Sequence, residues 1–216
     1  MKKFAVVLAG CGVYDGAEIH EATLCLLAIV RNGAEYQCFA PDVEQYHVVN
    51  HLTGEVVNEK RNVLVESARI ARGNVKNLKE FKASDYDAII LPGGFGVAKN
   101  LSTFAFKGAD CEVNEELQTA IEEMLAAKKP IGAMCIAPAV VAKIIGNKVE
   151  VTIGQDSGTA AAVEACGAVH KLADNEEVVC DLRYKVFSTP CYMLNASIVQ
   201  IAEGANNIVK AMLPYM

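Results

Sequence analysis

A cysteine at an expected strand-to-helix junction is the residue best placed to do chemistry. Cys135 follows the apolar run Pro130–Met134, which predicts a buried strand, and precedes Pro138, a residue type favoured in the first turn of a helix. Small neighbours leave room for a sharp turn of the kind called a nucleophile elbow. A thiol there faces the positive end of the helix dipole, which favours the thiolate. A buried structural cysteine would give the same local sequence, so both interpretations stay open at this point.

A glycine-rich turn is the second candidate. Pro92–Gly96 follows the apolar strand pattern Tyr86–Leu91. Because glycines let backbone N–H groups approach a ligand closely, this turn and the N–H of Ile136 could form an oxyanion hole. An ordinary glycine turn is the alternative. The separate pair Gly10 and Gly12 is looser than a dinucleotide fingerprint, and no acidic residue stands at the end of a second strand, so no dinucleotide site is predicted.

Two carboxylates could assist a thiol. Glu18 and Glu21 are three residues apart, so they fall on one face of a helix predicted over residues 16–32, whereas His20 points elsewhere. A glutamate buried against a thiol would have a raised pKa and could transfer a proton. Exposed carboxylates favoured by the helix dipole are the alternative.

Apolar strand patterns alternate with helical patterns along the chain. Strands are predicted at 4–9, 35–40, 86–91, 130–134 and 185–188, with shorter ones near 152 and 178–179. Helices are predicted at 16–32, 62–71, 114–127, 137–145, 160–167 and 193–212, and a turn-rich stretch at 42–61 has Gly54 as a hairpin candidate. This order predicts one α/β domain over residues 1–216, with a mostly parallel sheet and helices on both faces. Ligands in such sheets bind beyond the carboxyl ends of the strands, where 10–16, Pro92–Gly96 and Cys135 are expected to gather.

Charge and composition narrow the partners and the location. The net charge is −6 without a basic run, so nucleic acid is not expected as a partner, and no apolar stretch approaches the roughly 18 residues of a membrane span. None of the eight cysteines forms a C-x-x-C pair, which predicts reduced thiols in a cytoplasmic protein without a metal site. Residues 1–11 imitate a lipoprotein signal, but Phe4–Ala9 is needed as the first strand, so cleavage is not expected.

Seven stretches spread over nearly the whole chain resemble one family. They are GCGVYDGAEIHEA (10–22), CFAPD (38–42), NHLTGE (50–55), RNVLVESARIARG (61–73), LPGGFGVAKNLSTFA (91–105), MCIAPA (134–139) and TPCYML (189–194). With them the chain resembles the ElbB-type proteins, also called sigma cross-reacting or isoprenoid-biosynthesis-associated amidotransferase-like proteins. These belong to the PfpI-like, class I glutamine amidotransferase-like superfamily.

The resemblance implies a fold, an assembly and an activity. It implies a flavodoxin-like three-layer sandwich, a homodimer, and a nucleophilic Cys135 with Glu21 as its acidic partner. It also implies a weak, cofactor-free glyoxalase activity on a small aldehyde, sometimes described as protein deglycation.

The same resemblance implies how the pocket is built. Gly94 and Ile136 match the oxyanion-hole positions of the superfamily. Gly93 belongs to the same glycine turn, and Glu18, one helical turn before Glu21, is expected to line the same pocket.

Departures from the family pattern argue against glutaminase chemistry. True amidotransferases complete a Cys-His-Glu triad with a downstream His-x-Glu, but the only histidine after Cys135 is His170, which Lys-Leu follows. Many superfamily glyoxalases and proteases also carry a histidine directly after the nucleophile, where this chain has Ile136. The site therefore lacks the usual imidazole base, so we expect slow turnover unless a carboxylate replaces it.

Two hypotheses follow. In the first, the Cys135 thiolate adds to glyoxal or methylglyoxal, Glu21 moves a proton between the two carbons, and water releases glycolate or lactate. In the second, the protein is a non-catalytic sensor or binding protein whose Cys135 is reversibly oxidised.

Overall fold

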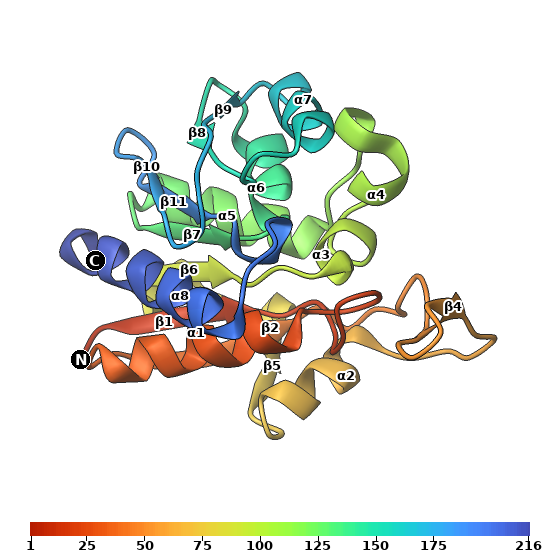
Figure 1. Cartoon of the computed structure of the whole chain (residues 1–216). Coiled ribbons are helices and arrows are strands. Elements are labelled where there is room, and N and C mark those ends of the chain that lie inside the picture. Colours follow the sequence, from red (N-terminus) through yellow and green to blue (C-terminus); the bar gives the residue numbers. More distant parts are fainter.

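A seven-stranded sheet forms the centre of the computed structural model, which describes residues 1–216 (Figure 1). In spatial order its strands are β10 (Val179–Asp181), β11 (Val186–Thr189), β7 (Ile131–Met134), β6 (Ala88–Leu91), β1 (Lys3–Val7), β2 (Glu35–Ala40) and β5 (Val75–Asn77). Only β10 runs antiparallel to its neighbour. The predicted mostly parallel sheet is confirmed.

Helices cover both faces of the sheet, as the alternating sequence patterns predicted (Figure 1). Helices α1 (Ile19–Arg31) and α8 (Ile198–Met212) pack together on one face. The other face is covered by α3 (Phe95–Lys99), α5 (Glu115–Ala126), α6 (Ala137–Ile145) and α7 (Ser157–Ala165). The remaining helices are α2 (Val63–Ile70) and the one-turn α4 (Phe104–Lys107).

Two hydrophobic cores lie on the two sides of the sheet. Along β1, Ala5 and Val7 belong to the core under α5 and α6, while Phe4 and Val6 belong to the core under α1 and α8. This alternation follows from the two-residue period of a strand. It explains why the central strands read as unbroken apolar runs, since both of their faces are buried. The fold is therefore a flavodoxin-like three-layer sandwich.

The structure differs from the predicted elements mainly at their ends. Helix α1 begins at Ile19 rather than at residue 16, and α8 begins at Ile198 rather than at residue 193, because Ser197 caps it. Strand β5 and helices α3 and α4 were not predicted, since each is too short to show a period. The predicted hairpin is present as β3 (Val49–Asn50) and β4 (Glu55–Val56). A second small sheet joins β8 (Glu150–Val151) and β9 (Val169–His170), and no helix is long and apolar enough to cross a membrane.

Backbone packs directly on backbone where the loops after β1 and β6 meet. The N–H of Gly96 donates to the carbonyl of Gly16 at 2.8 Å. A Cβ at Gly96 would lie 2.4 Å from the carbonyl oxygen of Ala9 and 2.6 Å from the Cα of Gly16. These two loops therefore keep their spacing only with glycine at residue 96.

We predict that Gly96→Ala lowers the free energy of unfolding by about 1–3 kcal/mol, because the added methyl group must push two backbone segments apart. Urea denaturation followed by circular dichroism measures this. The control is Gly158→Ala in α7, where a Cβ would lie 3.6 Å from the nearest atom, Asp156 Oδ2. That variant should keep or gain stability, since alanine favours helices by up to about 1 kcal/mol over glycine. Equal losses in both variants would contradict the tight packing at Gly96.

Candidate active site

Cys135 occupies a strained turn between β7 and α6. Its φ is +58°, in the left-handed region that non-glycine residues rarely adopt. Its N–H donates to the carbonyl of Thr189 at 3.0 Å, which extends the pairing of β7 with β11 by one residue. The residue is 8% exposed. Sheet pairing on one side and the helix on the other hold the thiol in the elbow geometry that the sequence predicted.

Glu21 is fully buried beside this thiol. One carboxylate oxygen, Oε2, accepts the N–H of Gly93 at 2.9 Å, and the other, Oε1, accepts the N–H of Tyr192 at 3.2 Å. The Cys135 thiol forms a hydrogen bond with the same carboxylate. The structure thus brings together the cysteine and the glutamate that the sequence singled out.

Burial controls the protonation of this pair. Burial, and then the charge of Glu18, raise the pKa of Glu21 to about 7. Burial and the charge of Glu21 raise the pKa of the Cys135 thiol, against the N–H groups of Gly94 and Ile136, which lower it. The N–H of Ile136 at the start of the helix favours the thiolate, as expected, but burial and the neighbouring carboxylate oppose it more strongly, so the thiol pKa is raised.

Gly93 and Gly94 fit the site for different steric reasons. A Cβ at Gly93 would lie 2.3 Å from the Cβ of Cys135 and 2.6 Å from Glu21 Oε2, so no side chain fits between them. Gly94 has a φ of +99°, and its N–H, like that of Ile136, is directed at the Cys135 sulfur. Two N–H groups therefore converge beside the sulfur, as an oxyanion hole requires.

Glu18 lies just before α1 rather than within it. As the N-cap residue, it accepts the N–H of Glu21 with its carboxylate at 2.7 Å, and its own N–H donates to the carbonyl of Gly93 at 2.9 Å. It is 8% exposed and lines the cleft, as expected. His20 points away and bonds the hydroxyl of Tyr192 at 2.9 Å on the exposed side.

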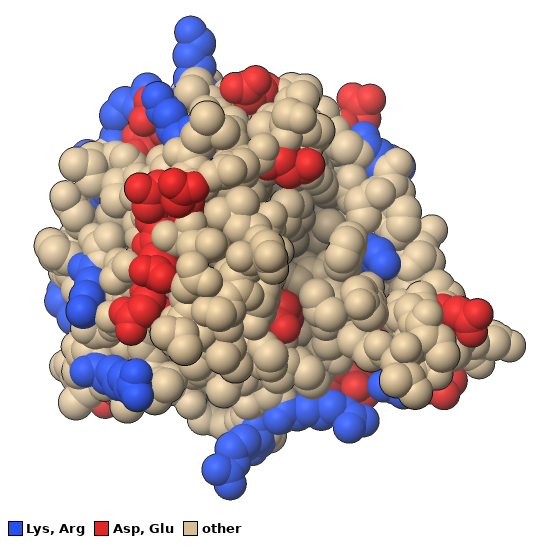
Figure 2. All heavy atoms as spheres, in the orientation of Figure 1, with Lys and Arg blue, Asp and Glu red and all other residues tan.

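A cleft of about 380 Å³ opens onto Cys135. Its lining residues are Val13, Glu18, Gly94, Phe95, Cys135, Ile136, Asp156, Thr159, Tyr192 and Met193. Figure 2 shows the face onto which the cleft opens: it is hollowed near its centre and mostly uncharged there, with acidic atoms in and beside the hollow and a basic group to its right. No histidine is among the lining residues, and the chain holds no group of three or more histidine, cysteine or acidic residues arranged for a metal ion.

Sequence reasoning missed the contribution of the segment after β11. Tyr192 and Met193 lie on a short 3₁₀ turn, Cys191–Met193, and enter the cleft beside Cys135. The signal was Pro190, two residues after the strand pattern 185–188, because the carboxyl end of that strand lies at the same edge of the sheet as Cys135. Asp156 and Thr159, which also line the cleft, come from the start of α7.

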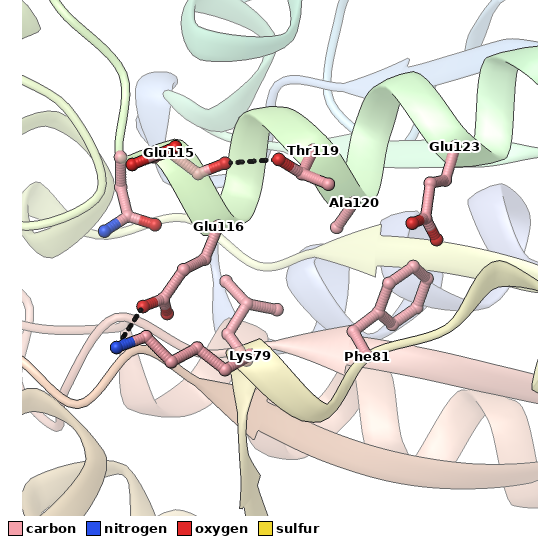
Figure 3. A pocket seen from close by; sticks show the side chains of 9 residues that line it. Lys79, Phe81, Glu115, Glu116, Thr119, Ala120 and Glu123 are labelled. Carbon is pink, nitrogen blue, oxygen red and sulfur yellow. Dashed lines mark hydrogen bonds and ion pairs between the residues drawn. The ribbon is translucent and has the colours of Figure 1, made fainter.

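A second hollow, of about 510 Å³, lies between α5 and the 3₁₀ turn Leu78–Glu80. Figure 3 shows Lys79 and Glu116 facing each other across it, with their charged atoms 3.6 Å apart. Its lining shares no residue with the Cys135 cleft and contains no cysteine or histidine. We therefore place the candidate active site at Cys135.

Comparisons with known proteins agree with the fold. The chain is 49% identical to the rat ES1 protein homolog, mitochondrial, over 98% of this chain and 83% of that protein. It is 47% identical to the human mitochondrial glutamine amidotransferase-like class 1 domain-containing protein 3, over 98% and 82% of the two chains. The chain belongs to this amidotransferase-like family of ES1 proteins. No protein-family model matches it.

Solved structures extend the similarity. An isoprenoid biosynthesis protein with an amidotransferase-like domain from Ehrlichia chaffeensis is 40% identical, with a TM-score of 0.94 over 100% of this chain and 99% of that one. Drosophila melanogaster DJ-1beta is 16% identical, with a TM-score of 0.58 over 98% and 90% of the chains. Glyoxalase III from Candida albicans is 14% identical, with a TM-score of 0.62 over 98% and 97%. The last two share the fold, and the superfamily resemblance is confirmed.

The predicted cytoplasmic location is wrong. The rat and human relatives are named mitochondrial, and so is the zebrafish ES1 protein, which is 35% identical over 95% of this chain and 83% of that protein. The prediction rested on cysteines that form no disulfides. Free thiols indicate a reducing environment, but they do not distinguish one reducing compartment from another.

We predict that Glu21→Gln lowers the apparent pKa of the Cys135 thiol, because it removes the negative charge that opposes the thiolate. The rate of Cys135 alkylation by iodoacetamide, followed by peptide mass spectrometry from pH 6 to pH 10, reports this pKa. The variant should therefore react faster than the wild type near pH 7. Glu203→Gln, an exposed change of equal charge on α8, is the control and should leave the profile in place. A raised or unchanged pKa in Glu21→Gln would show that the carboxylate does not act on the thiol.

Proposed function

We propose that this protein is a cofactor-independent enzyme of the glyoxalase type, which converts glyoxal to glycolate or methylglyoxal to lactate. Cys135 is the nucleophile and Glu21 the proton carrier. The observation that supports this best is the buried contact between a thiol and a carboxylate whose pKa is about 7. A carboxyl group with that pKa can both accept and donate a proton near neutral pH.

The first step joins the thiol to the substrate. Cys135 gives its proton to Glu21 as the sulfur attacks an aldehyde carbon, and the carbonyl oxygen takes up negative charge. The N–H groups of Gly94 and Ile136 lie beside the sulfur and can donate to this oxygen. Protonation of the oxygen by Glu21 completes a hemithioacetal and restores the carboxylate.

The later steps move one proton and add one water. Glu21 removes the proton from the carbon bound to sulfur, giving an enediolate, and returns it to the neighbouring carbon, while the hydroxyl proton on the first carbon passes to the oxygen on the second. The product is a thioester of the hydroxy acid. Water then attacks the thioester carbonyl, breaks the carbon–sulfur bond and releases glycolate or lactate with the regenerated thiol. Glyoxal plus one water thus equals glycolic acid, so the balance requires no oxidant or cofactor.

Slow turnover is expected from the same geometry. The thiol pKa is raised, so little thiolate exists before substrate binds, and no histidine lines the cleft to share the proton transfers. Glu21 must serve as base and acid in turn. Protein deglycation would be a second activity of the same site. It would be limited to aldehyde adducts that fit into the 380 Å³ cleft.

The sensor hypothesis has less support. Oxidation-sensitive cysteines are accessible thiols with a low pKa, whereas Cys135 is 8% exposed and its pKa is raised. The homodimer that the family resemblance implies stays a prediction, which light scattering of the purified protein would test.

We predict that purified wild type consumes glyoxal and releases glycolate, that Cys135→Ala abolishes this, and that Glu21→Gln lowers kcat by about 10²–10⁴-fold, the usual contribution of a general acid–base. Glycolate is measured by chromatography with a parallel assay of glyoxal loss.

The matched control is Cys180→Ser, which removes an exposed thiol outside the cleft and should retain wild-type turnover. Because glyoxal also modifies surface amines and thiols, glyoxal loss without glycolate release does not count as turnover. Full activity in Cys135→Ala would rule out the proposal.

A further inference from the structure

We infer that the Cys135 cleft admits uncharged electrophiles and excludes anionic ones, and that Glu18 is the residue that enforces this selection. The inference rests on the proposed function and narrows its substrate class to aldehydes that carry no carboxylate or phosphate group. It concerns which molecules reach the thiol, so it can be tested without relying on turnover.

The lining of the cleft carries charge of one sign. Its ionisable side chains other than the thiol and the Tyr192 phenol are the carboxylates of Glu18 and Asp156, and it contains no lysine, arginine or histidine. The buried Glu21 carboxylate lies behind the thiol and adds to the same field. A ligand with a carboxylate would thus meet two acidic groups and no cation that could pair with it.

Hydrogen bonds hold the backbone and the carboxylate of Glu18 in place at the cleft. Its carboxylate accepts the N–H of Glu21 at 2.7 Å, and its own N–H donates to the carbonyl of Gly93 at 2.9 Å. Asp156 is exposed and caps α7 through the N–H of Thr159 at 2.7 Å, so water screens its charge more strongly. Glu18 is therefore the dominant fixed charge at the entrance to the thiol.

Lys99 and His20 lie near the cleft without lining it. Lys99 donates to the carbonyl of Tyr14 at 3.0 Å and lies over the ring of Phe95, 5.0 Å from its centre. His20 bonds the hydroxyl of Tyr192 on the exposed side. Neither side chain is among the residues that line the cleft, so an anionic ligand inside it has no basic side chain in direct contact.

Alkylation of Cys135 by a matched pair of reagents tests the inference. Iodoacetamide and iodoacetate are nearly equal in size and react by the same displacement of iodide, but only iodoacetate is anionic. The ratio of their rates at Cys135, measured by peptide mass spectrometry, cancels the thiol pKa because both reagents need the same thiolate. We expect the iodoacetate-to-iodoacetamide ratio in the wild type to be about tenfold or more below that of glutathione, from the repulsion between like charges a few ångströms apart.

Two variants assign the effect to Glu18. Glu18→Gln should raise the ratio about tenfold toward that of glutathione. Glu18→Ser, which retains a favoured N-cap residue, should do the same and guards against misfolding of the first variant. Glu203→Gln is the control for net charge and should leave the ratio unchanged. The exposed Cys180 provides an internal control, since its ratio should be the same in all the variants.

The outcomes separate this inference from the proposed function. A wild-type ratio equal to that of glutathione, or a ratio that neither Glu18 variant changes, would overturn the inference. A Cys135 that reacts with neither reagent would also overturn it, because the cleft would then be closed to all small electrophiles. A low ratio that both variants relieve, in a protein that releases no glycolate, would support the charge selection and remove the enzyme proposal.

Discussion

The buried carboxylate of Glu21 is the interaction on which the rest of the site depends. Placing a carboxylate out of contact with water costs several kcal/mol unless hydrogen bonds replace its hydration. Here the N–H groups of Gly93 and Tyr192 and the thiol of Cys135 provide those bonds. One side chain on α1 therefore fixes the loops after β6 and β11 and orients the thiol at the same time. This arrangement requires glycine at residue 93, because any side chain there would collide with Cys135 and Glu21.

The same carboxylate changes what kind of nucleophile the thiol is. A helix end alone would favour a thiolate, but a negative charge in direct contact opposes it. The thiol and the carboxyl group are therefore better regarded as one unit that holds a mobile proton. Such a unit suits chemistry in which a proton leaves one atom and returns to another within a single turnover. It is less suited to a redox sensor, which needs a stable thiolate that can react with an oxidant.

Much of this arrangement could be predicted from the sequence because it depends on local patterns. The apolar runs at 4–9, 86–91 and 130–134 predicted the central strands, and their carboxyl ends placed the glycine turn and Cys135 at one edge. The pairing of Glu21 with the thiol came from the family resemblance. Tyr192 could not be predicted, since its place depends on how β11 pairs with β7, and the protonation of Cys135 depends on burial that no local pattern reports.

The distance along the chain between the parts of the site has a consequence for folding. Glu21 and Tyr192, which share a hydrogen bond, are 171 residues apart in the sequence. Contacts between such distant segments require closure of long loops, which makes them slow to form. Until β11 has paired with β7, the Glu21 carboxylate lacks the N–H of Tyr192 as a hydrogen-bond donor. Cys135 then lacks the surroundings that set its reactivity in the folded protein. The reactive centre therefore comes into existence only with the completed sheet, so partly folded chains do not carry it.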